Sequence, residues 1–266
     1  MGLLIILLSF VFEYIDSSLG MGYGTSLTPI LLLLGFNPLG IIPPILLAQL
    51  FAGSLASLMH HYFGNADFKI KSRPKHKNDS WLQHFKKVAP ENLKLALLLA
   101  LGGILGTLAA VLIAVNVSPF FLKLYIGILI LVMGMFILLT LNKKFKFSWK
   151  KVSVFSTLAS FNKGLSGGGY GPIITGGQIL SGVHSKNAVA ITTLAESLTC
   201  LIALILYFII GANIDWQLAP YLLIGGIASA PVSAYTVKII NTRRLSVAIA
   251  LIAIFIGAIT LVRVLV

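Results

Sequence analysis

A glycine-rich stretch, EYIDSSLGMGYG at residues 13–24, interrupts an apolar segment that runs over residues 3–34. A second stretch, FNKGLSGGGYG at residues 161–171, interrupts the apolar segment at residues 152–180. Non-helical backbone at membrane depth is tolerated only where it is buried in protein or lines a cavity. The two stretches therefore predict two helix breaks inside a membrane.

The composition supports this membrane assignment. Of the 266 residues 58% are hydrophobic and 10% are charged, and the mean hydropathy is +0.98. A soluble domain carries about 25% charged residues. Further apolar spans of the roughly 20 residues that cross a bilayer lie at 38–62, 92–115, 120–141, 188–210, 218–240 and 245–266. We expect an all-α integral membrane protein.

The chain also contains an internal repeat. A shift of 147 residues places Gly20, Gly22 and Gly24 on Gly167, Gly169 and Gly171, and beyond residue 90 the best offset falls to about 123. The fall equals the extra length of the 69–90 loop. The sequence thus predicts a first repeat at 1–141 with an insertion at 64–90, and a second at 142–266. Each would be a re-entrant or broken helical hairpin plus three transmembrane helices.

The basic residues predict how the repeats are oriented. Thirteen of the 20 lysines and arginines lie in 69–94 and 143–151, next to apolar spans, as in cytoplasmic loops. Loops 64–90 and 142–151 are therefore expected in the cytoplasm and the chain in the cell (inner or plasma) membrane. Equivalent loops of the two halves differ in charge, which predicts opposite orientations and thus the inverted repeat common in secondary transporters. The net charge of +13 then reflects topology, and no nucleic-acid partner is expected.

Two interpretations of the interrupted segments remain open. If the loops on both sides of residues 152–180 are cytoplasmic, that segment enters and leaves on one side as a hairpin with its glycine-rich apex in the membrane. Residues 3–34 would do the same from outside. The alternative is a single spanning helix that is broken in the middle.

The glycine clusters are candidate anion sites. Glycine allows close backbone approach, and free amides at a helix N-terminus attract negative charge. The alternative is tight helix packing, where small residues also concentrate. The candidates are Gly20, Gly22, Gly24, Thr25 and Ser26 in the first half, and Ser166, Gly167, Gly168, Gly169, Tyr170 and Gly171 in the second.

Four ionisable residues fall in the apolar zone, where they are costly and mark function: Glu13, Asp16, Lys163 and Glu196. Asp16 and Lys163 occupy equivalent repeat positions. They could pair, with Lys163 switching to an anionic substrate, or form a structural ion pair only. Glu196, whose counterpart is Gln49, is interpreted as a lone carboxylate that carries a proton or as a neutral hydrogen-bonded acid.

Other residues carry weaker signals. His60 and His61 lie near a span end and are expected at the membrane interface, and Cys200, the single cysteine, is expected in the core. No metal, phosphate-loop or nucleophile motif is recognisable. We expect no cofactor and no enzymatic activity.

Two quoted motifs resemble those of a known family. IDSSLGMGYGTSLTPIL at residues 15–31, followed by LGFNP at 34–38, resembles the first-repeat signature of the TauE/SafE sulfite-exporter family, and LSGGGYGPI at 165–173 resembles the second. The resemblance implies a permease for sulfite, sulfoacetate or other sulfonates, coupled to protons. The family's glycine motifs correspond here to Gly20, Gly22, Gly24 and Gly167–Gly169.

The resulting prediction is a secondary anion transporter that works by alternating access. Its partners are a small anion and membrane lipid, and a homo-oligomer is left open. The alternative is an uncoupled channel for small anions or neutral solutes. The predicted proton-coupling residues are Glu196 and Asp16, and the predicted substrate-binding residues are Asp16, Ser17, Ser18, Gly20, Gly22, Gly24, Asn162, Lys163, Ser166, Gly167, Gly168, Gly169 and Tyr170.

Overall fold

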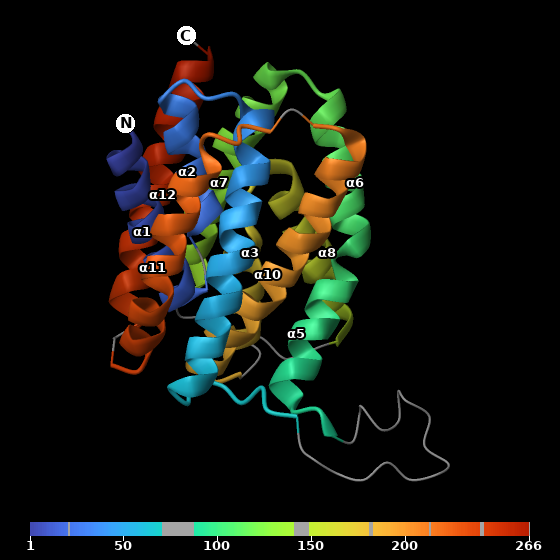
Figure 1. Cartoon of the computed structure of the whole chain (residues 1–266), viewed down its shortest axis with the longest axis vertical. Coiled ribbons are helices and arrows are strands. Elements are labelled where there is room, and N and C mark those ends of the chain that lie inside the picture. Colours follow the sequence, from blue (N-terminus) through green and yellow to red (C-terminus); the bar gives the residue numbers. More distant parts are fainter. Residues whose placement is uncertain are drawn as a thin grey trace.

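The computed structural model describes every residue except 21, 71–87, 141–148, 181–182, 213, 240–241 and 266. Most of the basic insertion and of the loop before residue 149 therefore lies outside the described residues. Every regular element within them is an α-helix, and the helices run mainly along the long axis of the molecule (Figure 1). They are α1 (Gly2–Leu19), α2 (Tyr23–Leu33), α3 (Pro38–Tyr62), α5 (Glu91–Gly102), α6 (Ile104–Asn116), α7 (Pro119–Thr140), α8 (Trp149–Ser166), α9 (Tyr170–Leu180), α10 (Ser185–Ile210), α11 (Ala219–Val237) and α12 (Thr242–Leu265).

Several helices are long and apolar enough to cross a membrane. Within the described ranges there are five such segments: Gly2–Leu19, Pro38–Tyr62, Glu91–Asn116, Pro119–Thr140 and Ser185–Ile210. Four of these match predicted spans, and the fifth is the first arm of the interrupted segment. The predicted spans at 218–240 and 245–266 form α11 and α12, which are not among the five. A multi-pass, all-helical membrane protein is thereby confirmed.

The chain reverses direction at both glycine clusters. Ser9 Oγ and Tyr23 Oη lie 2.9 Å apart, although fourteen positions along a straight helix span about 21 Å. A Cβ atom added to Gly169 would lie 3.2 Å from Asn162 Cβ, whereas seven helical positions span about 10 Å. Both segments are therefore hairpins, which favours the hairpin prediction over a single broken helix.

Glycine is required at both turns. Gly20 and Gly22 have φ of 69° and 138°, and Gly167 and Gly169 have φ of 74° and 79°. Side chains other than hydrogen clash with the backbone at such angles. The φ angles are thus positive at equivalent glycines of both halves, which agrees with their alignment at an offset of 147 residues.

The helix boundaries agree with the repeat found in the sequence. Adding 147 to the bounds of α1 and α2 gives the bounds of α8 and α9. The same offset carries the start of α3 to the start of α10, and the end of α10 comes one position later. Local structure therefore supports a duplication, while the division of the chain at residue 141 stays a prediction.

The two halves are interleaved. α1 packs on α11 of the second half, and α8 packs on α5 and α6 of the first. Ser9 Oγ donates to the Leu222 carbonyl (2.7 Å), and Ser156 Oγ donates to the Leu99 carbonyl. Ser9 and Ser156 differ by 147 and Leu99 and Leu222 by 123, the two offsets of the repeat. Each hairpin therefore docks on a helix of the opposite half through equivalent contacts.

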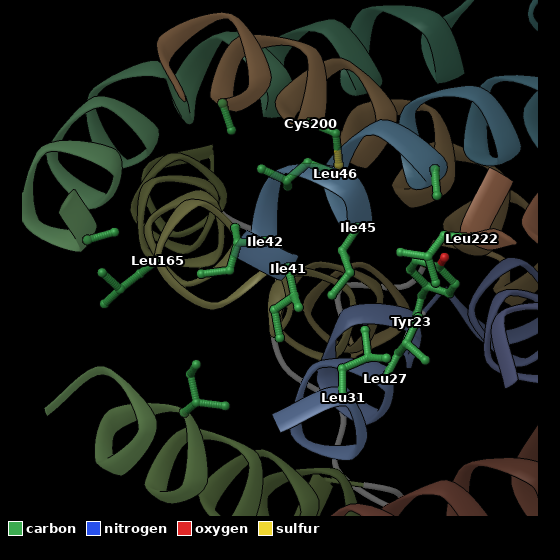
Figure 2. Packing of buried hydrophobic residues seen from close by; sticks show 14 of the residues in the cluster. Tyr23, Leu27, Leu31, Ile41, Ile42, Ile45, Leu46, Leu165, Cys200 and Leu222 are labelled. Atoms are coloured by element: carbon green, nitrogen blue, oxygen red, sulfur yellow. The ribbon is translucent and has the colours of Figure 1, made fainter. Parts of the chain in front are cut away.

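The apolar core surrounds the first hairpin. α2 places Tyr23, Leu27 and Leu31 against α3, and Cys200 of α10 lies in the same cluster, as expected (Figure 2). The residues of α3 in this contact are Ile41, Ile42, Ile45 and Leu46. Their complete burial keeps the short helix α2 inside the protein, where its neighbours shield the glycine turn from lipid.

Candidate functional site

The two glycine turns contact each other directly. A Cβ atom on Gly24 would lie 1.6 Å from the Gly167 carbonyl oxygen, and one on Gly168 would lie 2.4 Å from the Thr25 amide nitrogen. Real Cβ atoms essentially never approach this closely. Backbone therefore packs on backbone where the hairpins meet, and both positions admit glycine alone.

Threonine hydroxyls join the two turns in a symmetrical way. Thr28 Oγ1 donates to the Ser166 carbonyl (2.9 Å), and Thr175 Oγ1 donates to the Gly20 carbonyl (2.8 Å). Thr28 and Thr175 are 147 positions apart. The last carbonyls of a helix have no partner within that helix, and each bond contributes about 0.5–1.5 kcal/mol. Each hairpin thus caps the first helix of the other.

The amides of the second turn are occupied within the protein. Gly167 N–H donates to the Lys163 carbonyl, Gly168 N–H to Ser166 Oγ and Gly169 N–H to Thr25 Oγ1. The sequence predicts an anion held by such amides, but in this conformation they bind protein and the turns touch. An anion that binds between the turns therefore has to separate them.

Four polar side chains form a hydrogen-bonded chain between α1, α3, α8 and α10. Gln49 Nε2 donates to Asp16 Oδ2 (2.6 Å), and Lys163 Nζ donates to Gln49 Oε1. Lys163 Nζ also lies 2.8 Å from Glu196 Oε1. All four side chains are at most 5% exposed. Because α1, α3, α8 and α10 each supply one residue, the chain connects both hairpins to the helices that follow them.

This arrangement changes two of the sequence interpretations. Asp16 and Lys163 do approach each other, but Gln49 lies between them and forms hydrogen bonds to both. Glu196 is not a lone carboxylate, since Lys163 forms an ion pair with it. The four residues form two equivalent pairs at the 147-residue offset, Asp16 with Gln49 and Lys163 with Glu196. Helix spacing alone does not show which partner Lys163 selects.

A third carboxyl group belongs to the same cluster. Glu13 is fully buried, its Oε1 accepts a hydrogen bond from Ser17 Oγ (2.7 Å), and its Oε2 has no partner. The described residues of the cluster thus contain three carboxyl groups and one cation. A buried charge without a partner costs several kcal/mol. The charges of Glu13, Asp16 and Glu196 consequently cannot all be balanced by Lys163.

The remaining predicted residues lie around the turns. Ser18 is fully buried and its Oγ has no partner among the described residues. Asn162 Oδ1 accepts a hydrogen bond from the Tyr125 hydroxyl, and Ser166 Oγ donates to the Asn162 carbonyl. Tyr170 packs in an apolar cluster, which suits a structural role. Of the three predicted serines, Ser18 is thus the one whose hydroxyl has no partner in the described part of the chain.

A second polar group, formed by Thr175, Gln178 and Thr192, was not assigned from the sequence. Thr192 Oγ1 accepts a hydrogen bond from Gln178 Nε2 (2.8 Å) and lies 2.9 Å from Thr175 Oγ1, to which it can donate because the Thr175 hydrogen is used by the Gly20 carbonyl. Gln178 Oε1 is buried without a partner. The equivalence of Thr175 with Thr28 is the signal that identifies this group in retrospect.

The side chain of His60 lies inside the protein and not on its surface. It is fully buried, its Nδ1 accepts a hydrogen bond from Asn65 Nδ2 (3.0 Å), and its Nε2 donates to the Ser17 carbonyl (2.8 Å). The Tyr207 hydroxyl makes the equivalent bond to the Gly164 carbonyl (2.9 Å) in the second half. His60 therefore caps the end of α1.

Replacing His60 with alanine is expected to destabilise the protein by about 2–3 kcal/mol, because the Ser17 carbonyl and the Asn65 amide lose a buried partner. The matched control is His61→Ala, since the His61 side chain is 39% exposed and its contacts with Ala66, Phe68 and Asp67 are long, at 3.2, 3.3 and 3.8 Å. In detergent, the temperature of thermal unfolding should fall clearly for His60→Ala and change little for His61→Ala. Equal loss in both variants would contradict the capping role.

A multi-pass helical protein with two buried hairpin turns and a charged cluster beside them has the features of a membrane transporter. The family model for the sulfite exporter TauE/SafE matches residues 80–260. The chain belongs to this family. It is also similar to the probable membrane transporter protein YtnM of Bacillus subtilis (strain 168), with 24% identity over 94% of this chain and 79% of that protein. No solved structure matches the chain.

Proposed function

We propose that this protein is a secondary transporter of small sulfur-containing anions, such as sulfite, sulfoacetate or other organosulfonates, and that it is coupled to protons. The observation that carries the proposal is the buried chain Asp16–Gln49–Lys163–Glu196, which joins equivalent positions of both hairpins. The family description names sulfite, so sulfite is the first substrate to test. The family and the relative point to transport and not to an enzyme.

In this proposal the anion binds Lys163 in place of Glu196. Lys163 Nζ has one charged partner in the described cluster, at 2.8 Å, and an oxyanion offers the same kind of charge-assisted hydrogen bond. Glu196 then takes up or releases a proton as it loses and regains its partner. Ser17, Ser18, Asn162 and Ser166 flank the ion chain and supply hydroxyl and amide groups to the anion.

Alternating access follows from an inverted repeat. The equivalent helix bounds, the paired positive-φ glycines and the reciprocal Ser9 and Ser156 contacts support two related halves. The charge difference between equivalent loops supports their opposite orientation. When one hairpin moves against the other, the threonine bonds across the turns break and the ion chain becomes accessible from one side at a time.

The proposal is tested with purified protein in proteoliposomes. Uptake of sulfite, thiosulfate, sulfoacetate, taurine and sulfate is measured with and without a pH gradient. We expect saturable flux of at least one sulfur-containing anion, accelerated by the gradient. Flux that never saturates and ignores the gradient would instead indicate an uncoupled channel, and no flux of any anion would reject the proposed substrate class.

A further inference from the structure

Glu13 is the ionisable residue of the cluster that the repeat does not explain. Its counterpart at the 147-residue offset is Ser160, whereas Asp16 corresponds to Lys163 and Gln49 to Glu196. Ser160 and Glu13 both face glycines of the opposite half, Gly103 and Gly226. A serine is therefore sufficient for packing at this place, and the carboxyl group of Glu13 has another reason to be there.

No cation among the described residues contacts the Glu13 carboxyl group. Its Oε2 is buried without a partner, and Oε1 is bound by the neutral hydroxyl of Ser17. The ionisable groups that interact with it electrostatically are Asp16 of α1, Tyr23 of α2, Lys163 of α8, and Glu196 and Cys200 of α10. His60 of α3 binds the Ser17 carbonyl and Gln49 binds Asp16, so α3 adds no charge at Glu13.

The charge balance of the cluster favours protonated carboxyl groups at Glu13 and Asp16. Lys163, its described cation, is paired with Glu196. Glu13 and Asp16 are buried and have no cation in contact among the described residues, and the donors to Asp16 are the neutral Gln49 amide and the Tyr23 backbone N–H. Each carboxyl group would cost several kcal/mol as an anion. A neutral, protonated form of each carboxyl group avoids this cost.

We infer that Glu13, together with Asp16, is a proton-binding site that has to be loaded before an anion binds Lys163, so that anion and protons cross the membrane in the same direction. The inference rests on the proposed function and deepens it. Loss of a proton from either carboxyl group creates a negative charge beside Lys163, and that charge repels the incoming anion. Coupling by this route is symport.

The open position at Glu13 suits a proton better than a metal cation. The described residues contain no group of three or more histidine, cysteine or acidic side chains that could hold a metal ion. Asp16 Oδ2 is already held by Gln49, and Glu13 Oε1 is held by Ser17. Hard cations require about six oxygen ligands, whereas a proton requires one carboxyl oxygen, such as the unpartnered Oε2 of Glu13.

The test is the pH dependence of anion affinity in the wild type and in Glu13→Gln. Glutamine is isosteric with a protonated glutamic acid, and its amide oxygen still accepts the Ser17 hydrogen bond. Thiosulfate is the probe, because its charge is constant over the neutral range, and binding is followed by thermal shift or calorimetry in sodium-free buffer. The matched control is Glu91→Gln, whose side chain is 84% exposed and paired with Lys94.

We expect log Kd to rise with pH in the wild type and in Glu91→Gln. In Glu13→Gln the limiting slope should be smaller by about one, since each linked proton changes affinity about tenfold per pH unit. Equal slopes in Glu13→Gln and wild type, or an affinity that depends on sodium, would overturn the inference and leave the proposed transport intact. If the wild type binds no anion at any pH, the proposed function fails with it.

Discussion

Lys163→Met is expected to abolish anion transport while the protein remains folded and inserted. The variant removes the cation of the described cluster, which leaves Glu13, Asp16 and Glu196 without any positive partner. Methionine fills a similar volume with a flexible apolar chain, and Glu196 can become neutral by taking up a proton. Loss of the partner of a buried charge costs about 3–5 kcal/mol. Because the variant also lacks the charged donor that binds the anion, flux in proteoliposomes should fall on the order of 100-fold or more.

Two further variants separate substrate binding from a purely structural ion pair. Lys94→Met removes a lysine whose partner, Glu91, is exposed, and it should transport like the wild type. The double variant Lys163→Met/Glu196→Gln leaves no unpaired charge where the ion pair was, so its stability should recover. If the ion pair serves stability alone, transport returns in the double variant. We expect it to stay absent, and normal flux in either Lys163→Met variant would reject the role.

Gly24→Ala is expected to produce the second large effect. The added methyl carbon would overlap the Gly167 carbonyl at 1.6 Å and approach Gly168 Cα to 2.8 Å. Both are backbone atoms of the opposite hairpin, so no side chain can rotate away. The turns have to move apart, and the hydrogen bonds of Thr25 and Thr28 across them are strained or lost. Overpacking of this kind costs about 1–3 kcal/mol or more.

The matched control is Gly40→Ala, because Gly40 lies in α3 with ordinary φ and its nearest neighbour would be 3.7 Å away. Helix propensity favours alanine there by about 1 kcal/mol. Transport and thermal unfolding should be nearly normal in Gly40→Ala, while Gly24→Ala should lose transport and unfold at lower temperature. A Gly24→Ala protein with wild-type stability and flux would show that the turns do not need direct contact.

The membrane class, the two breaks and the repeat could be predicted because each depends on local properties. Hydropathy over about 20 residues reflects the thickness of the bilayer, and the glycines at 20, 22, 167 and 169 reflect backbone angles that other residues avoid. The ionisable residues of the cluster were also identifiable, since charged side chains in apolar segments are rare for energetic reasons. None of these arguments requires knowledge of which helices are neighbours.

The pairing of these residues could not be predicted in the same way. The equivalence of Asp16 and Lys163 suggested a direct pair, yet Gln49 lies between them and Lys163 pairs with Glu196. The position of His60 near a helix end suggested an interface, yet the docking of α11 buries it through the Asn65 bond to the Ala234 carbonyl. In both places, helices from distant parts of the sequence supply the partner.

The sequence by itself determined that this is a membrane protein, where its helices break and which of its residues are costly to bury. Those properties belong to single segments of the chain. Only the tertiary structure decided that the two turns touch, that the amides of the second turn are already occupied and that the described cluster contains one lysine and three carboxyl groups. Hydrogen bonds and ion pairs act over about 3 Å, and the chain comes to that distance only after the helices of both halves have interleaved.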